Sequence, residues 1–463
     1  MGQRSPRVPN ERLTALVRET GWSHTQFAWA VNRVGAERGD SLRYDQSAVC
    51  HWLHGTMPRA RVRPLLLEAL ARRLNRPVTE SAAGFPTAPD TGPGPSGIPT
   101  VESLVDLGSH DMDPSRRGVL GVGLFSVALT IPGWPDVVGR AEAVQSGRAR
   151  RIGQGEVDTV VAMTERISDL DDEFGGRHAR PMAAAFLVNT VAPYLRADAP
   201  EAVRKSALSA AAYLSFLAGY MAVDEGHHGL AQRYYVKSLE LAGAADNHLT
   251  YCATLRGMSV QAINLRHDRL SLELADAAAE AAPQAGPRVR ALLSGQQAHA
   301  AARAGDRPGA LRLIRETEAS LDRAESREGR TFTSYDPAAL NYHIAEIRHE
   351  FGDPHGSVEA LQEAERLRNS NHRRTRVHRG GLLAERQLGV GHLEAACATW
   401  NRALDEYPHV QSGRADERVV DAVRLLRPYL KNPVARAVHD RARALAPSGP
   451  NAPNGRGGVT GLL

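Results

Sequence analysis

The chain has 463 residues, 42% hydrophobic and 24% charged, a balance typical of soluble globular proteins and long enough for two or three domains. Its net charge of +5 is concentrated at one end, because residues 1–80 hold 13 Arg against 7 acidic residues. Cys50, Cys252 and Cys397 lie far apart, which argues against a disulfide framework or a zinc knuckle, whereas the basic end indicates a polyanionic partner for that end alone.

The first 80 residues predict a small bundle of helices. Asn10 and Ser23 stand at N-cap positions before helices over 11–20 and 24–37, Asp45 precedes a third helix, and Pro64 opens a fourth. Their apolar positions predict a compact core, formed by Leu13, Leu16, Phe27, Ala28, Val49, Trp52, Leu53, Leu67, Leu70 and Leu74.

The third helix lies in "YDQSAVCHWLHGTMPR", Tyr44 to Arg59, and has two unlike sides. One side is apolar, with Val49, Trp52 and Leu53 at i, i+3, i+4 spacing. The other side holds Ser47, Cys50, His51 and His54, without Lys or Arg. A helix side that only had to be solvated would usually be richer in charge. Small neutral donors and acceptors instead suit the reading of base edges.

The middle of the chain divides into a linker and an apolar connector. Residues 84–99 hold five Pro and four Gly, so we expect a Pro/Gly-rich linker over 84–108 after a head domain of residues 1–83. Residues 109–149 form the connector, where a 13-residue apolar run, Val119 to Ile131, follows "DPSRR". A membrane span needs roughly 20 residues, so we expect a buried helix or hairpin and no membrane partner.

Residues 150–445 form an Ala/Leu-rich body with a recurring pattern, and residues 446–463 are expected to be a disordered tail. A turn residue is followed by a small residue five positions on, a bulky one nine on and a small one twelve on. The pattern begins at Gly226, Gly305, Gly352 and Gly391, with a degenerate copy near Arg266. Small residues let paired helices approach closely, and such pairs must stack to bury their apolar faces.

This pattern resembles the tetratricopeptide repeat. The last unit, with Leu383, Ala384, Ala396, Trp400, Ala403 and Pro408, matches best, although the last two Gly spacings, 47 and 39, exceed the repeat length of about 34. The resemblance implies an all-α protein with a tetratricopeptide-like α-solenoid. In such a solenoid, Asn264, Asn341 and Tyr342 are candidates for binding a peptide or protein partner, because Asn side chains can hold an extended backbone.

The head resembles the helix-turn-helix domains of the Xre and lambda-repressor class, with "WSHTQFAWA" and "DQSAVCHWLHG" as the two motif helices. The resemblance implies double-stranded DNA as partner, with base contacts from Gln46, Ser47 and Ala48 and with Cys50 and His51 behind them. His24 occupies the place where the family commonly has Gln, and Gln26 lies beside it. The phosphate contacts would come from Arg43, Arg59, Arg61 and Arg63. The 21 residues from Ala28 to Val49 exceed the family's spacing.

The domain order resembles actinobacterial regulators of differentiation and antibiotic production. It implies a cytoplasmic, nucleoid-associated, sequence-specific transcriptional regulator whose repeats bind a peptide, a protein or a second copy as a homodimer. The alternative is a tetratricopeptide-type protein-interaction scaffold that binds no DNA.

Other chemistry finds little support in the sequence. "HIAEIRHE" places His343 and Glu346 at i, i+3 without forming H-E-x-x-H, and neither a phosphate-binding loop nor a nucleophile elbow occurs. We expect no enzymatic activity, no cofactor and no metal. The basic run "RNSNHRRTRVHRG", Arg368 to Gly380, is interpreted as a solvated helix surface.

Overall fold

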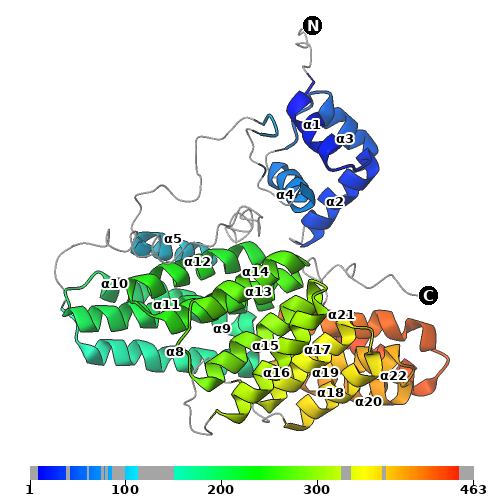
Figure 1. Cartoon of the computed structure of the whole chain (residues 1–463). Coiled ribbons are helices and arrows are strands. Elements are labelled where there is room, and N and C mark those ends of the chain that lie inside the picture. Colours follow the sequence, from blue (N-terminus) through cyan, green and yellow to red (C-terminus); the bar gives the residue numbers. More distant parts are fainter. Residues whose placement is uncertain are drawn as a thin grey trace.

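The computed structural model describes residues 9–37, 42–59, 62–74, 78, 82–85, 100–112, 151–324, 335–367 and 372–447. Within these ranges the chain is helical, apart from one isolated bridge between Arg151 and Asp198 (Figure 1). The prediction of an all-α protein, with a small helical head and a helical-repeat body, is confirmed.

The head contains four described helices: α1 (Glu11–Glu19), α2 (His24–Glu37), α3 (Gln46–Leu53) and α4 (Arg63–Leu74). The predicted caps begin three of them. Asn10 Oδ1 accepts from the Leu13 amide at 3.0 Å, Ser23 Oγ from the Gln26 amide at 3.2 Å, and Asp45 Oδ1 from the Ala48 amide at 2.9 Å. Each cap satisfies an amide that the first helical turn leaves without a partner.

The predicted core of the head is confirmed, with Leu67 and Leu74 half-buried at its edge. The head also continues two residues beyond the expected boundary at 83, because Ala83 and Phe85 are buried in the same core. The Asn10 side chain donates to the Ala83 carbonyl at 2.9 Å and fixes this last segment to the start of α1.

A helix, α5 (Thr100–Met112), occupies the end of the expected linker, 84–108, and the first residues of the expected connector, 109–149. Its apolar side, with Val101, Leu104 and Leu107, belongs to the core of the body. Its last turn carries Asp111, which pairs with Arg180 and accepts from the Tyr234 hydroxyl at 3.0 Å. The body therefore begins near residue 100. The apolar run from Val119 to Ile131 and the tail beyond residue 447 lie outside the described residues.

After α5, the described part of the body continues with α8 (Gln154–Phe174), α9 (Gly176–Phe186), a π-helical turn (Leu187–Val191) and α10 (Ala192–Leu195). Antiparallel helix pairs then follow one another along the chain (Figure 1). The pairs are α11 (Glu201–Asp224) with α12 (His228–Ala244), α13 (His248–Asn264) with α14 (Asp268–Glu280), α15 (Pro287–Arg303) with α16 (Arg307–Asp322), α17 (Pro337–Glu350) with α18 (Pro354–Leu367), α19 (Arg373–Gly389) with α20 (Leu393–Glu406), and α21 (Gly413–Leu426) with α22 (Pro433–Leu445). Short 3₁₀ turns, Tyr407–His409 and Arg427–Tyr429, follow α20 and α21.

The predicted repeat pattern lies at the turns between paired helices and along each second helix. Gly226, Gly305, Gly352 and Gly391 have φ between 76° and 84°, and Arg266 of the degenerate copy has φ 60°. Such positive φ values favour glycine, which explains the residue at four of these five turns. The small and bulky positions that follow are buried, as at Ala231, Tyr235 and Ser238. Ser238 Oγ lies 2.9 Å from Thr254 Oγ1 of the next pair, so a small residue also joins neighbouring pairs.

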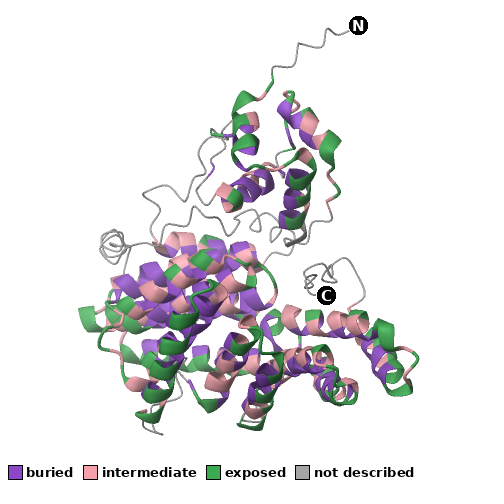
Figure 2. Ribbon diagram, turned by 45° about the vertical axis from the view of Figure 1, so that its right-hand side comes forward, coloured by how far each residue is buried: buried purple, intermediate pink, exposed green. Residues whose placement is uncertain are grey.

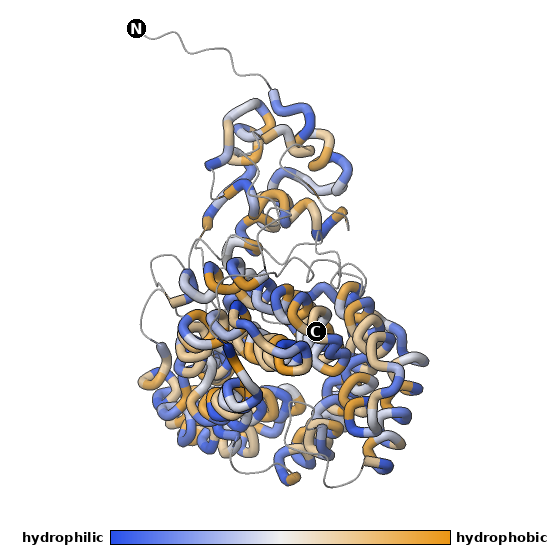
Figure 3. The backbone as a smooth tube through the Cα atoms, turned by 90° about the vertical axis from the view of Figure 1, so that its left-hand side faces the viewer, coloured by the Kyte–Doolittle hydropathy of each residue, from blue (hydrophilic) through white to orange (hydrophobic). Residues whose placement is uncertain are grey.

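Helix α11 lies at the centre of the body core. Among the described helices, it alone is long and apolar enough to cross a membrane, but most of this helix is buried against α8, α9 and α12 (Figure 2). Along the other helices, hydrophobic and hydrophilic residues alternate (Figure 3), as expected for helices that pack on one side. The apolar character of α11 follows from its central position.

The body closes on itself, because its first helices contact its last pairs. The Gln411 amide donates to the Phe174 carbonyl at 2.6 Å, and the Arg177 amide donates to the Gln411 carbonyl at 3.1 Å. Gly175, with φ 92°, packs so tightly against the Gln411 backbone that a Cβ would clash. We call these contacts the seam: residues 171–177 and 220–225 on one side, and 372–374 and 407–418 on the other.

Candidate functional site

The start of α3 in the head is held by a side-chain clamp from α2. Asn32 Nδ2 donates to the Tyr44 carbonyl at 2.7 Å, and the Tyr44 amide donates to Asn32 Oδ1 at 2.8 Å. The Tyr44 ring meets Trp52 edge-on, with centroids 4.9 Å apart. Part of the long segment before Tyr44 extends α2 to Glu37, and residues 38–41 lie outside the described ranges. The clamp fixes where α3 begins despite this insertion.

The predicted base-contacting residues gather where α3 passes the first turn of α2. Gln46, Ser47 and His51 are exposed, whereas Ala48 and Cys50 are half-buried. Gln46 Oε1 lies 3.4 Å from the Thr25 hydroxyl, and Cys50 Sγ lies 3.3 Å from His24 Nδ1. The Gln26 side chain accepts from the Ser23 amide at 2.8 Å and so completes a capping box. Gln26 therefore has a structural role at the start of α2.

The predicted phosphate contacts are distributed around α3. Arg43 and Arg59 are exposed on either side of it, and Arg63 Nε donates to the Pro58 carbonyl at 3.0 Å. Arg61 lies outside the described residues. Arg43 and Arg59 thus provide two exposed positive charges that flank an uncharged helix surface.

The three predicted partner-binding residues of the body differ in their surroundings. Asn264 is exposed at the last residue of α13, and Asn341 is half-buried, with Nδ2 donating to the Pro337 carbonyl at 2.9 Å. Tyr342 is half-buried, and the guanidinium of Arg379 lies 4.0 Å from its ring centroid. Asn341 is thus engaged within its own helix, whereas Tyr342 belongs to a larger charged surface.

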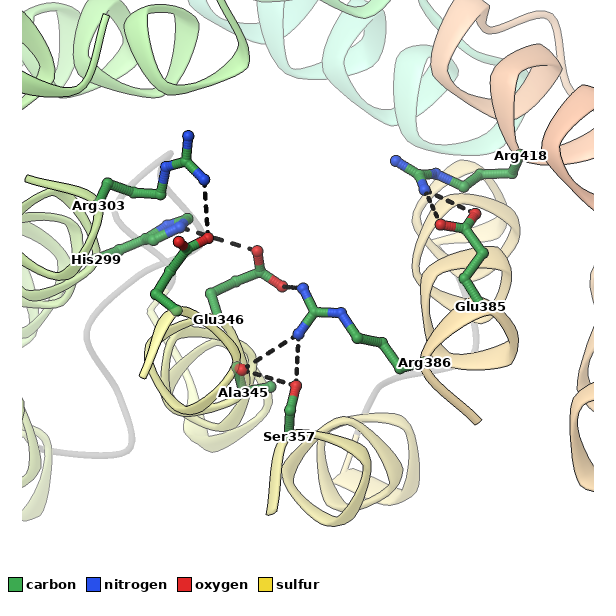
Figure 4. Close-up of polar contacts among 9 residues, drawn as sticks. His299, Arg303, Ala345, Glu346, Ser357, Glu385, Arg386 and Arg418 are labelled. Atoms are coloured by element: carbon green, nitrogen blue, oxygen red, sulfur yellow. Dashed lines mark hydrogen bonds and ion pairs between the residues drawn. The ribbon is translucent and has the colours of Figure 1, made fainter. Parts of the chain in front are cut away.

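That larger surface is formed by the first helices of successive pairs, and we call it the inner wall. Its half-buried side chains include Arg256, Tyr342, Glu346, His378, Arg379, Glu385, Arg386, Arg414 and Arg418. Figure 4 shows residues from α15, α17, α19 and α21 pointing toward one space, with Arg303 and Arg418 on opposite sides. Arg386 bonds Glu346 at 2.9 Å and Ser357 at 2.6 Å, so α17, α18 and α19 are tied together at this wall.

The interpretation of the basic run on α19 as a solvated helix surface is wrong for Arg374, whereas His372 is exposed and Arg373 and Arg376 are partly exposed. Arg374 is buried at the seam, where it pairs with Asp171 at 3.1 Å and approaches Asp224 at 3.5 Å. His378 and Arg379 lie on the inner wall. Arg374 is buried because the body closes, and its carboxylate partners belong to helices far away in the sequence.

Burial keeps two histidines of the body, His343 and His378, in their neutral form. Burial lowers the pKa of His343 and His378 well below the usual range, and nearby positive charges lower both further. The positive groups that act on His378 include Arg418, Arg414 and Arg379. His343 Nδ1 lies 2.8 Å from the Tyr335 hydroxyl, so that nitrogen is engaged by a neighbouring side chain.

Comparisons with known proteins concern mainly the head. A family model described as the SP15 N-terminal domain matches residues 13–86, the extent of the observed head core. No curated protein sequence matches the chain. Among solved structures, a monomeric mutant of IFIT1 with m7Gppp-AAAA is 13% identical over 96% of each chain, with a TM-score of 0.34. The assignment of the body as a helical-repeat fold rests on its stacked helix pairs.

Proposed function

We propose that this chain is a partner-binding helical-repeat protein whose inner wall is the binding surface. The observation that carries this proposal is the concentration of charged and aromatic side chains on the first helix of each pair, namely on α13, α15, α17, α19 and α21. Elsewhere on those helices, small and apolar residues pack against neighbours. In this proposal the protein binds rather than catalyses, and it acts in the cytoplasm. The expected pairing of two copies stays a prediction.

Capture by the tagged full chain tests this function. Proteins retained by the wild type are compared with those retained by Arg386→Gln and by Arg315→Gln, which changes an exposed arginine on α16. We expect specific partners to be lost with Arg386→Gln and kept with Arg315→Gln. Identical retention by all three proteins would contradict the inner wall as the binding surface.

A second candidate function, sequence-specific DNA binding, is favoured by the head. An exposed uncharged surface at Gln46 and Ser47, flanked by Arg43 and Arg59, supports an α3 that reads bases while arginines contact phosphates. With this activity the chain would be a transcriptional regulator, as the Xre-type resemblance implies; without it, the chain would be an interaction scaffold.

Titration of the full chain with promoter fragments at several salt concentrations separates these two possibilities. A DNA-binding head gives affinity that falls steeply with salt and differs between sequences. A scaffold without DNA binding gives no saturable binding at physiological salt.

A further inference from the structure

Most carboxylates of the inner wall and the seam already have a guanidinium partner. The nitrogen–oxygen distances lie between 2.7 and 3.1 Å for the pairs Glu346–Arg386, Glu385–Arg418, Glu350–Arg303 and Asp171–Arg374. These four carboxylates are therefore already paired, and among the remaining acidic groups Glu417 acts on Arg414 electrostatically without forming an ion pair with it.

Two further arginines are present and lack such partners. Arg256 on α13 and Arg414 on α21 are half-buried, and neither forms an ion pair with a carboxylate in the described part of the chain. Arg256 Nε and Arg414 Nη2 are buried atoms without a hydrogen-bond partner there. Burial lowers the pKa of Arg256, and the neighbours that act on it most are tyrosines. Buried guanidinium donors without acceptors are costly, which favours a ligand that supplies them.

Arg256, Arg379 and Arg414 all act electrostatically on one tyrosine, Tyr342, as does the carboxylate of Glu346. Arg379 covers the Tyr342 ring at 4.0 Å, and both Arg256 and Arg414 lie within electrostatic reach of Tyr342. We call Arg256, Arg379 and Arg414 the arginine cluster. Its members come from three different inner helices, so the closed body brings them together.

We propose that the arginine cluster binds an acidic peptide segment, whose carboxylates accept hydrogen bonds from the guanidinium groups of Arg256 and Arg414. This inference rests on the proposed function, in which the inner wall is the partner surface. Guanidinium groups form planar, two-donor contacts with carboxylates, and these are stronger inside a protein than in open water.

The aromatic residues near the cluster favour a peptide over a nucleic acid. Single-stranded nucleic acids are usually held by bases stacked on open aromatic faces. Here the guanidinium of Arg379 covers Tyr342, that of Arg374 lies 5.3 Å from the Tyr220 centroid, and Tyr235 and Tyr335 are fully buried. Donors for acidic groups are present, while open stacking surfaces are not provided by these four tyrosines.

Fluorescence anisotropy of a labelled ten-residue Glu-rich peptide, titrated with the full chain at physiological salt, tests the inference. A Gln-rich peptide of the same length is the matched ligand control. Arg256→Gln and Arg414→Gln are the test variants. Arg312→Gln, exposed on α16, and Arg59→Gln, exposed on the basic head, are the control variants. Each test variant is expected to weaken binding about tenfold or more, because a hydrogen bond to a charged group contributes about 1.5–3 kcal/mol.

The expected result is saturable binding of the Glu-rich peptide, less than twofold change in the control variants, and weak binding of the Gln-rich peptide. Arg256→Lys keeps the charge without the planar fork and should lose affinity only in part, which separates ligand contact from misfolding. Equal binding by wild type and both test variants would overturn the inference. The inference would also be overturned if a ten-nucleotide single strand displaced the peptide and bound more tightly through the same arginines. Binding of the Gln-rich peptide that depends on Arg386 would overturn only the acidic ligand and leave the proposed function standing.

Discussion

At the residue scale, Gln46 and Arg59 are expected to contribute differently to DNA binding. Gln46 is exposed and uncharged at the start of α3, so Gln46→Ala should weaken binding to the preferred sequence by about 1–3 kcal/mol and leave binding to random DNA nearly unchanged. Arg59→Ala should weaken binding to all sequences alike and lower the salt slope by about one, because it would remove a phosphate contact. Titrations of both variants across salt measure the two effects. Unchanged sequence preference in Gln46→Ala would contradict the assigned position of α3.

The buried histidines predict a stability that depends on pH. Burial lowers the pKa of His228 to about 3 and of His267 to about 4, and it lowers the pKa of His343 and His378 as well. Unfolded histidines titrate near about 6.5, so the unfolded chain binds more protons below that pH. Stability is therefore fully present above pH 6.5 and falls as the pH drops toward 4. Asp171 opposes this trend, because burial raises its pKa to about 7. Below pH 7 the folded chain therefore binds one proton at Asp171 that the unfolded chain does not bind until the pH is lower.

Thermal unfolding between pH 7.5 and 5 checks this prediction. The midpoint temperature should fall with pH, and His378→Gln should reduce the slope, since one proton contributes about 1.4 kcal/mol per pH unit. His409→Gln is the control, because His409 is exposed. A midpoint that stays constant or rises on acidification would be inconsistent with neutral buried histidines.

At the element scale, the clamp between α2 and α3 predicts the effect of Asn32→Ala. The Asn32 side chain makes two hydrogen bonds to the Tyr44 backbone, and a small core of four helices offers few other contacts to position α3. Losing both bonds should lower the free energy of unfolding of the head by about 1–3 kcal/mol. Urea unfolding followed by tryptophan fluorescence, to which Trp22, Trp29 and Trp52 of the head contribute, measures the change. Asn264→Ala, at an exposed position, should leave the curve unchanged; equal effects of both substitutions would argue against the clamp.

The features that could be predicted from the sequence are those set by interactions between residues close together in the chain. Caps such as Asn10 and Asp45, and the turn glycines of the repeats, act over four or five residues, and the structure confirms them. Helix α5 was missed because it follows a Pro/Gly-rich segment and its apolar side is satisfied only by the distant body. The inward position of Arg374 was missed for the same reason. Its carboxylate partners lie about two hundred residues away in sequence, and charge runs alone do not identify them.

At the scale of the whole molecule, Arg374 is expected to hold the seam closed. It is buried among Asp171, Asp172 and Asp224, and Arg374→Met would leave Asp171 and Asp224 without their cation, while Asp172 keeps its contact with His372. Removing one partner from a buried ion pair costs about 3–5 kcal/mol. The variant should unfold at lower denaturant than the wild type, whereas Arg312→Met on the outer helix α16 should not. A stability equal to wild type would show that the seam does not depend on this residue.

The central claim is that the repeats close into one body and thereby enclose the inner wall. Hydrogen–deuterium exchange at the amides of Arg177 and Gln411 tests it most directly, because their hydrogen-bond acceptors lie across the seam. In a closed body both amides should exchange as slowly as those inside neighbouring helices. In Arg374→Met both should become fast, while α13–α16 stay protected. Exchange of both wild-type amides at the rate of an exposed loop would contradict the closed body and, with it, the enclosed binding surface.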